Sequence, residues 1–96
     1  MSQRRAIFLR VSEEDYKYAH GLKELLCLNS FGELWRIMNS VFWRVLYNVM
    51  RGRLIVAVDE KGKVVQQLVF REIEQVRGIS KEKLPKELRK HFPLVQ

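Results

Sequence analysis

The sequence contains no threonine, only one cysteine and only two histidines. A lone cysteine, Cys27, excludes an intrachain disulfide, and His20 and His91 lie too far apart in the sequence to form a local metal site. No apolar run reaches the roughly 18 residues that a membrane span needs, because Arg36 and Arg44 interrupt the most apolar region. The first residues also lack the long apolar stretch of a signal peptide. We therefore expect no disulfide, no metal site and no membrane span.

Motifs typical of catalysis and of cofactor binding are also absent. The sequence has no glycine-rich phosphate loop, no paired-cysteine motif and no zinc-protease motif. The adjacent acids Glu13 and Glu14 are typical of a helix start rather than of an acid–base pair facing across a cleft. Cys27 follows the apolar face of a predicted helix, which favours a core position over a nucleophile. We expect no enzyme activity and no cofactor.

What the sequence does contain is apolar and basic. It has 96 residues, of which 47% are hydrophobic and 30% charged, a balance typical of a folded domain. A chain this short buries only about 65% of its unfolded surface, so oligomerisation is the remaining source of stability. The net charge of +7 favours nucleic acid or another anionic surface as partner, although solubility alone also explains such an excess. The residue usage, rich in Val, Leu, Lys, Arg and Glu, is similar to that of thermophile proteins.

The first half of the sequence predicts one strand and two helices. Residues 5–11 alternate between Ile7, Leu9 and Val11 on one face and Ala6, Phe8 and Arg10 on the other, which is typical of a strand. A helix is expected from Glu13, with Ser12 as its N-cap.

A second helix of about twenty residues follows, with Asn29 or Ser30 as its cap. Its apolar positions recur every three or four residues: Leu34, Ile37, Met38, Val41, Phe42, Val45, Leu46, Val49 and Met50. Trp35, Trp43 and Tyr47 widen this stripe, either as core or interface residues or as an aromatic platform for bases. So broad a stripe needs burial on two sides, which favours a second copy of the chain as partner.

The second half predicts a hairpin and a short basic helix. Gly52 is placed to end the second helix. Two apolar runs within about 54–70, joined by Asp59 to Gly62, favour a β-hairpin, although the spacing of the second run also suits a helix. A basic helix is expected at about 81–91, interrupted early by Pro85.

The segments RAIFLRVSEED and LNSFGELWRIMNSV together resemble the ribbon-helix-helix family of DNA-binding repressors. The resemblance covers residues 4–51. Its first part is a basic residue, an alternating apolar strand and a Ser at the helix cap. Its second part is a polar turn and a helix that starts with a small residue, Glu, an aliphatic residue, any residue and then Arg. It implies an α+β, mostly helical fold of β-α-α order that dimerises, with its strand paired to the partner's strand in the major groove. Residues 1–52 are then the DNA-binding and dimerisation module, and residues 53–96 form a C-terminal extension.

The resemblance also implies roles for individual residues. The outward face of the strand is expected to contact bases through Arg4, Ala6, Phe8 and Arg10. Phe8 departs from the family, which usually has a polar residue at this position. We expect Phe8 either to contact thymine methyl groups or to lie under the hairpin. Phosphate contacts are expected from Arg5, Asn29, Ser30 and Phe31, and Lys17 and Lys23 are further candidates. The dimer core is expected to consist of Ile7, Leu9, Val11, Leu34, Ile37, Met38, Val41, Phe42 and Val45.

These observations and the resemblance predict a homodimeric transcription regulator that binds a specific double-stranded DNA sequence. We expect it in the cytoplasm of a prokaryote, encoded by the prokaryote itself or by a virus that infects it. One alternative is an antitoxin in which residues 53–96 bind a toxin. Another is a protein-interaction or RNA-binding module that uses the basic C-terminal helix.

Overall fold

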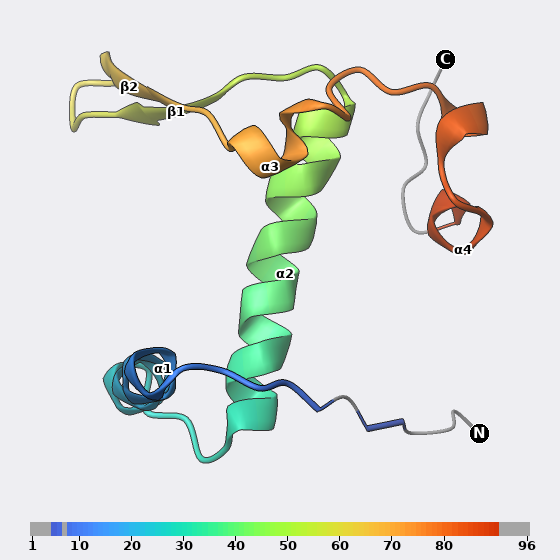
Figure 1. Ribbon diagram of the computed structural model, residues 1–96. Helices are drawn as coiled ribbons and strands as arrows, with labels where there is room; N and C mark the ends of the chain where they lie inside the picture. The colour runs from blue at the N-terminus through green and yellow to red at the C-terminus, as the bar shows by residue number, and fades with distance from the viewer. Residues whose placement is uncertain (1–4, 7, 91–96) are drawn as a thin grey trace. The chain divides into compact units, whose positions relative to one another are not determined.

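A computed structural model of the chain describes residues 5, 6 and 8–90. Its elements in chain order are α1 (Glu13–Leu25), α2 (Phe31–Met50), β1 (Ile55–Val58), β2 (Val64–Leu68), α3 (Arg71–Glu74), the 3₁₀ turn η1 (Lys81–Lys83) and α4 (Lys86–Arg89) (Figure 1). The chain divides into two compact units, residues 1–38 and 39–96, so that α2 contributes its first turns to one unit and its last turns to the other. The prediction that residues 1–52 form an independent module stays a prediction.

The predicted β-α-α order is wrong, because the order of elements is α-α-β. The segment of residues 5–11, predicted to be a strand, forms none at its described positions 5, 6 and 8–11. The strands found among the described residues are β1 and β2, which pair antiparallel with each other. A strand requires a partner for its N–H and C=O groups, and alternating side chains do not supply one. The ribbon-helix-helix fold is therefore replaced by a mixed α+β fold that begins with two helices.

The start of α1 agrees with its prediction. The backbone N–H of Asp15 donates to the Ser12 hydroxyl at 3.0 Å, which satisfies one of the free donors of the first turn. The acidic side chains of that turn complement the positive end of the helix dipole.

Both long helices end in the same backbone motif. At the end of α1, the N–H of Leu28 donates to the carbonyl of Lys23 at 2.9 Å, and Cys27 adopts a left-handed φ of 55°. At the end of α2, the N–H of Arg53 donates to the carbonyl of Asn48 at 2.9 Å, and Gly52 has a φ of 77°. The prediction for Gly52 is confirmed. Cys27, expected in the core, is exposed instead, because it occupies the turn position that a glycine usually holds.

The hairpin of about 54–70 is confirmed as β1 and β2, and the helical alternative for its second half is excluded. The register pairs Ile55 with Leu68 and is interrupted by an irregularity beside Val58. At the tip, the Asp59 carboxylate accepts the N–H groups of Lys61 and Lys63, each at 2.9 Å. This turn closes the hairpin with the two lysine side chains exposed.

The predicted helix of about 81–91 is instead two separate short turns, η1 and α4, with residue 91 outside the described part. Leu84 has an extended ψ of 140°, and Pro85 follows with a φ of −54°. A residue before proline is disfavoured in the helical conformation, so the helix cannot pass through Leu84. Pro85 was expected to interrupt one helix, and it instead divides the segment into two separate elements.

The core of unit 39–96 forms where the end of α2 meets the segments after the hairpin. Met50 and Leu84 are 3% and 4% exposed, and half-buried side chains pack against them: Leu46, Tyr47, Val76, Ile79 and Leu88. The N–H of Gly78 donates to the carbonyl of Val49 at 3.2 Å, which ties the chain after α3 to α2. None of the helices in the described part of the chain is long and apolar enough to cross a membrane.

Candidate nucleic-acid interface

The basic N-terminal segment lies exposed to solvent. Phe8 is 91% exposed and Leu9 is 67% exposed, and Arg10 and Val11 are exposed as well. The predicted division into a buried face with Leu9 and a solvent face with Phe8 is therefore not realised within one chain. Two residues assigned to the strand, Arg4 and Ile7, lie outside the described residues.

A groove of about 380 Å³ lies at the start of α2 and is lined by Arg5, Leu9, Phe31, Gly32 and Trp35. Arg5 and Leu9 are four residues apart, so in an extended backbone their side chains point to the same side. The groove thus combines an arginine with apolar and aromatic side chains beside the positive end of a helix. It brings together two of the predicted phosphate contacts, Arg5 and Phe31.

The other two predicted phosphate contacts, Asn29 and Ser30, form the cap of α2. The Ser30 hydroxyl accepts the N–H of Glu33 at 3.2 Å, and a Glu33 carboxylate oxygen accepts the N–H of Asn29 at 2.7 Å. This arrangement resembles a capping box, except that the Glu33 carboxylate accepts the N–H of the residue before the N-cap, and it stabilises the start of the helix. The Glu33 carboxylate occupies the backbone N–H of Asn29 and places a negative charge at the helix start. An anion would therefore have to bind to the backbone N–H groups of the first turn, beside this charge.

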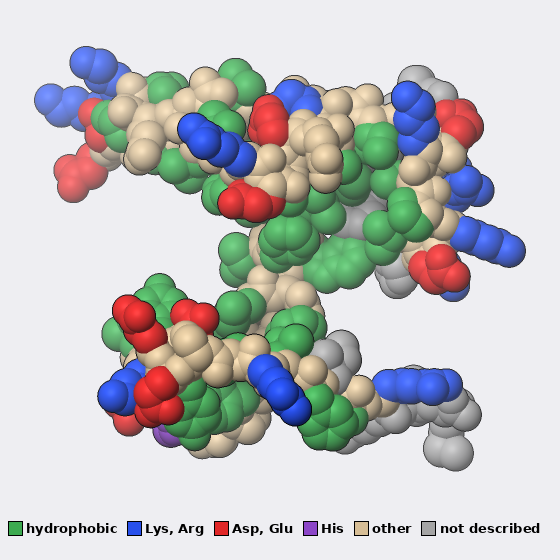
Figure 2. Space-filling view, in the orientation of Figure 1, with side chains coloured by type: hydrophobic (Ala, Val, Ile, Leu, Met, Phe, Trp, Pro, Cys, Tyr) green, Lys and Arg blue, Asp and Glu red, His purple; other side chains and the backbone are tan. Residues whose placement is uncertain are grey.

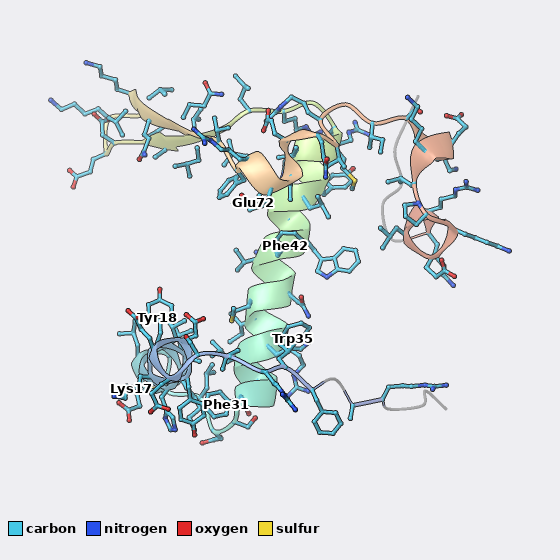
Figure 3. The ribbon with its side chains drawn as sticks, viewed as in Figure 1. Lys17, Tyr18, Phe31, Trp35, Phe42 and Glu72 are labelled. Carbon is cyan, nitrogen blue, oxygen red and sulfur yellow. The ribbon has the colours of Figure 1, made fainter. Side chains whose placement is uncertain are left out.

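An aromatic cluster, which the sequence analysis missed, joins α1 to the start of α2. The ring centroids of Tyr16 and His20 lie 5.3 Å apart, and those of His20 and Phe31 lie 5.2 Å apart. The Lys23 ammonium lies 4.8 Å from the centroid of the Phe31 ring. Figure 3 shows Phe31 next to α1, at the N-terminal end of α2, from which Trp35 also projects. Tyr16, His20 and Lys23 are spaced to share one face of a helix, and this spacing is the sequence signal from which the cluster could have been predicted.

The cluster has a consequence for charge. Lys23 lies over Phe31, and Arg5 lines the groove that Phe31 also lines. Two cations therefore lie close to the first turn of α2. Lys17, the other lysine considered for a phosphate contact, is exposed on α1.

Most of the predicted dimer core is exposed in the single chain. Leu34 is buried at 4% exposure and Val45 is half-buried. The other predicted members on α2 are exposed: Ile37, Met38, Val41 and Phe42. Hydrophobic side chains accordingly appear on the surface in the space-filling view (Figure 2). Trp35 and Trp43 are also partly exposed, at 46% and 36%, so the helix carries a broad apolar surface.

An ion pair within unit 39–96 joins Glu74 and Arg77. The Arg77 guanidinium donates to both carboxylate oxygens of Glu74, and also to the carbonyl of Arg53 at 2.6 Å. The hydrogen bond from Arg77 lowers the pKa of the Glu74 carboxyl below its ordinary value. This pair links the end of α3 to the residues that follow α2, so its role is structural. No cluster of metal-ligating side chains occurs within the described residues.

Comparisons of the chain with protein-family models, with curated proteins and with solved structures find no match. The resemblance of residues 4–51 to a known family is thus an untested one, and function has to be argued from the residues themselves.

Proposed function

We propose that this protein is a sequence-specific, double-stranded DNA-binding transcription regulator that acts as a homodimer. The observation that carries the proposal is the exposed segment with Phe8 and Arg10, beside a groove where Arg5 meets the start of α2. In this function the segment of residues 5–11 contacts DNA without pairing into a β-strand.

The chemistry of these side chains suits DNA. An exposed arginine such as Arg10 can donate two hydrogen bonds to O6 and N7 of guanine, the commonest base-specific contact in the major groove. Phe8 offers an apolar surface for a thymine methyl group. Arg5 and Lys23 are near the first turn of α2 and can contact phosphates, which hold the protein in register on the duplex. The net charge of +7 attracts the chain to DNA from a distance.

The homodimer is supported by the exposed apolar side chains of α2. A helix that leaves Met38, Val41 and Phe42 in water exposes apolar area whose burial is favourable. A second copy of the chain offers the same helix, and a two-fold contact between identical faces is the commonest oligomeric arrangement. A symmetric dimer binds a site with two-fold symmetry. Such a regulator would act in the cytoplasm of a prokaryote, encoded by the cell or by a virus of that host.

Selection of bound duplexes from a random pool, followed by sequencing, tests this function. We expect a short motif with two-fold symmetry. Enrichment without any motif would contradict sequence-specific regulation and favour general nucleic-acid binding. No enrichment, combined with tight capture of a single cellular protein by the full chain through residues 53–96, would favour the antitoxin alternative.

A further inference from the structure

The segment that contains η1 and α4 is held firmly on the end of α2. Leu84, between the two turns, is 4% exposed and packs with Met50, and Leu88 packs against the same cluster. The Arg89 guanidinium donates to the carbonyls of Leu84 and Glu82, each at 3.1 Å, which fixes the two turns to each other. The backbone of residues 81–90 therefore has a defined conformation.

This segment carries an excess of basic side chains on its exposed side. Residues 81–90 contain two acidic residues, Glu82 and Glu87, and five basic residues: Lys81, Lys83, Lys86, Arg89 and Lys90. All five basic side chains are exposed, and so are the two acidic ones, which leaves a net charge of +3 on the exposed side of the segment. Lys86 begins α4, and Lys90, the C-cap, follows one helical turn later, so the two lysines lie on the same side. In the space-filling view, Lys and Arg side chains lie along the outer side of the α4 region, with Asp and Glu side chains between them (Figure 2).

The apolar residues of the same segment point inward. Every large apolar side chain in residues 71–90 is buried or half-buried: Ile73, Val76, Ile79, Leu84 and Leu88. A protein-binding surface is centred on exposed aromatic or aliphatic anchors, and a membrane-binding helix inserts an apolar face. Neither feature is present on this side of the described segment. A surface of lysines without apolar anchors fits a polyanion.

We propose that this basic segment, through Lys81, Lys83 and Lys86, contacts the phosphate backbone of double-stranded DNA. The proposal rests on the function proposed above and assigns a role to the C-terminal extension. Lysine is a compact charge on a flexible stem and does not read base edges bidentately as arginine does. The segment therefore adds affinity and salt dependence to DNA binding, while sequence preference comes from the N-terminal segment. The hydrogen bonds from Arg89 to the carbonyls of Leu84 and Glu82 hold the backbone that carries these lysines in place.

The test uses the full chain with Lys81→Gln, Lys83→Gln and Lys86→Gln combined. Binding to a duplex of random sequence and to a selected duplex is titrated over a range of salt concentrations. Each phosphate contact contributes about 0.9 to the slope of log affinity against log salt concentration, so the slope should become shallower by about 2 to 3. The ratio of affinities for the two duplexes should not change. Far-ultraviolet circular dichroism confirms that the variant is folded.

A matched control removes three basic side chains elsewhere in the same unit, by Lys61→Gln, Lys63→Gln and Arg71→Gln. Asp59 holds the hairpin tip through backbone N–H groups, so the control keeps its turn. An equal change of slope in the control would show that net charge alone acts, and would overturn the proposal. An unchanged slope in the Lys81/Lys83/Lys86 variant would overturn it as well, while leaving the proposed function intact. If the unaltered chain bound no duplex, the proposed function and this inference would both fail.

Discussion

The carboxylate of Glu33 accepts the backbone N–H of Asn29 at 2.7 Å, across the turn that leads into α2. This hydrogen bond and the one from the Glu33 N–H to Ser30 hold the start of α2, the helix that exposes Met38, Val41 and Phe42. It also places a negative charge beside the amides that were expected to bind a phosphate.

Two substitutions of Glu33 separate these effects. Glu33→Ala removes the capping carboxylate and should lower the free energy of unfolding by about 0.5–2 kcal/mol, as measured by urea denaturation. Glu33→Gln keeps an acceptor for the backbone N–H of Asn29 but removes the charge and its interaction with the helix dipole, so stability should fall by less than in Glu33→Ala and DNA affinity should rise. A lower DNA affinity for Glu33→Gln would argue against an anion at the start of α2.

Substitution of Arg10 tests the base-contacting segment. Because Arg10 is exposed, Arg10→Ala should leave the thermal midpoint unchanged. It should weaken binding to the preferred duplex by about 1–3 kcal/mol if the guanidinium contacts a guanine. Binding to random duplexes should fall much less, and a titration of both duplexes measures the difference. An equal loss on both would assign Arg10 to a phosphate instead.

The homodimer is tested on the exposed surface of α2. Phe42→Lys places a charge in the predicted dimer core and should produce monomers, as measured by multi-angle light scattering at micromolar concentration. Ser40→Lys adds the same charge at an exposed position outside the predicted core and serves as the control. Dissociation by both variants, or by neither, would show that this surface is not the interface.

Leu84 tests the core of unit 39–96. It is 4% exposed against Met50, so Leu84→Ala should cost about 2–5 kcal/mol of stability by leaving a cavity. Glu87→Ala, at an exposed position in the same segment, should change the free energy of unfolding by no more than about 0.5 kcal/mol. Equal stability of the two variants in urea denaturation would contradict the packing of Leu84.

The Glu74–Arg77 pair predicts a pH dependence. The hydrogen bond from Arg77 lowers the pKa of Glu74 in the folded protein from its ordinary value of 4.5. The stabilisation is therefore present above pH 4.5 and is lost as the pH falls through the lowered, folded-state pKa. Glu74→Gln should lose less stability than the unaltered chain over that acid range. Thermal unfolding midpoints of both proteins across the range measure this difference, and parallel curves would contradict it.

Much of the secondary structure was predictable because its causes are local. Ser12 and the acids after it start α1, the apolar spacing of α2 sets its length, and the turn from Asp59 to Gly62 closes the hairpin. Each of these signals acts over a few neighbouring residues, so the sequence alone was sufficient. Pro85 was also a local signal, and its effect on Leu84 was underestimated.

The pairing of strands and the composition of the core depended on distant residues. Alternation in residues 5–11 shows which side chains share a face, but only a partner makes a strand. β2 supplies a partner to β1, whereas the described residues of that segment pair with no strand. In the same way, nothing near Leu84 in the sequence indicates that Met50 covers it. The cluster of Tyr16, His20 and Phe31 required the turn between α1 and α2 to bring its members together. Local hydrogen bonding and periodicity therefore account for the helices, whereas contacts between distant residues required the three-dimensional arrangement of the chain.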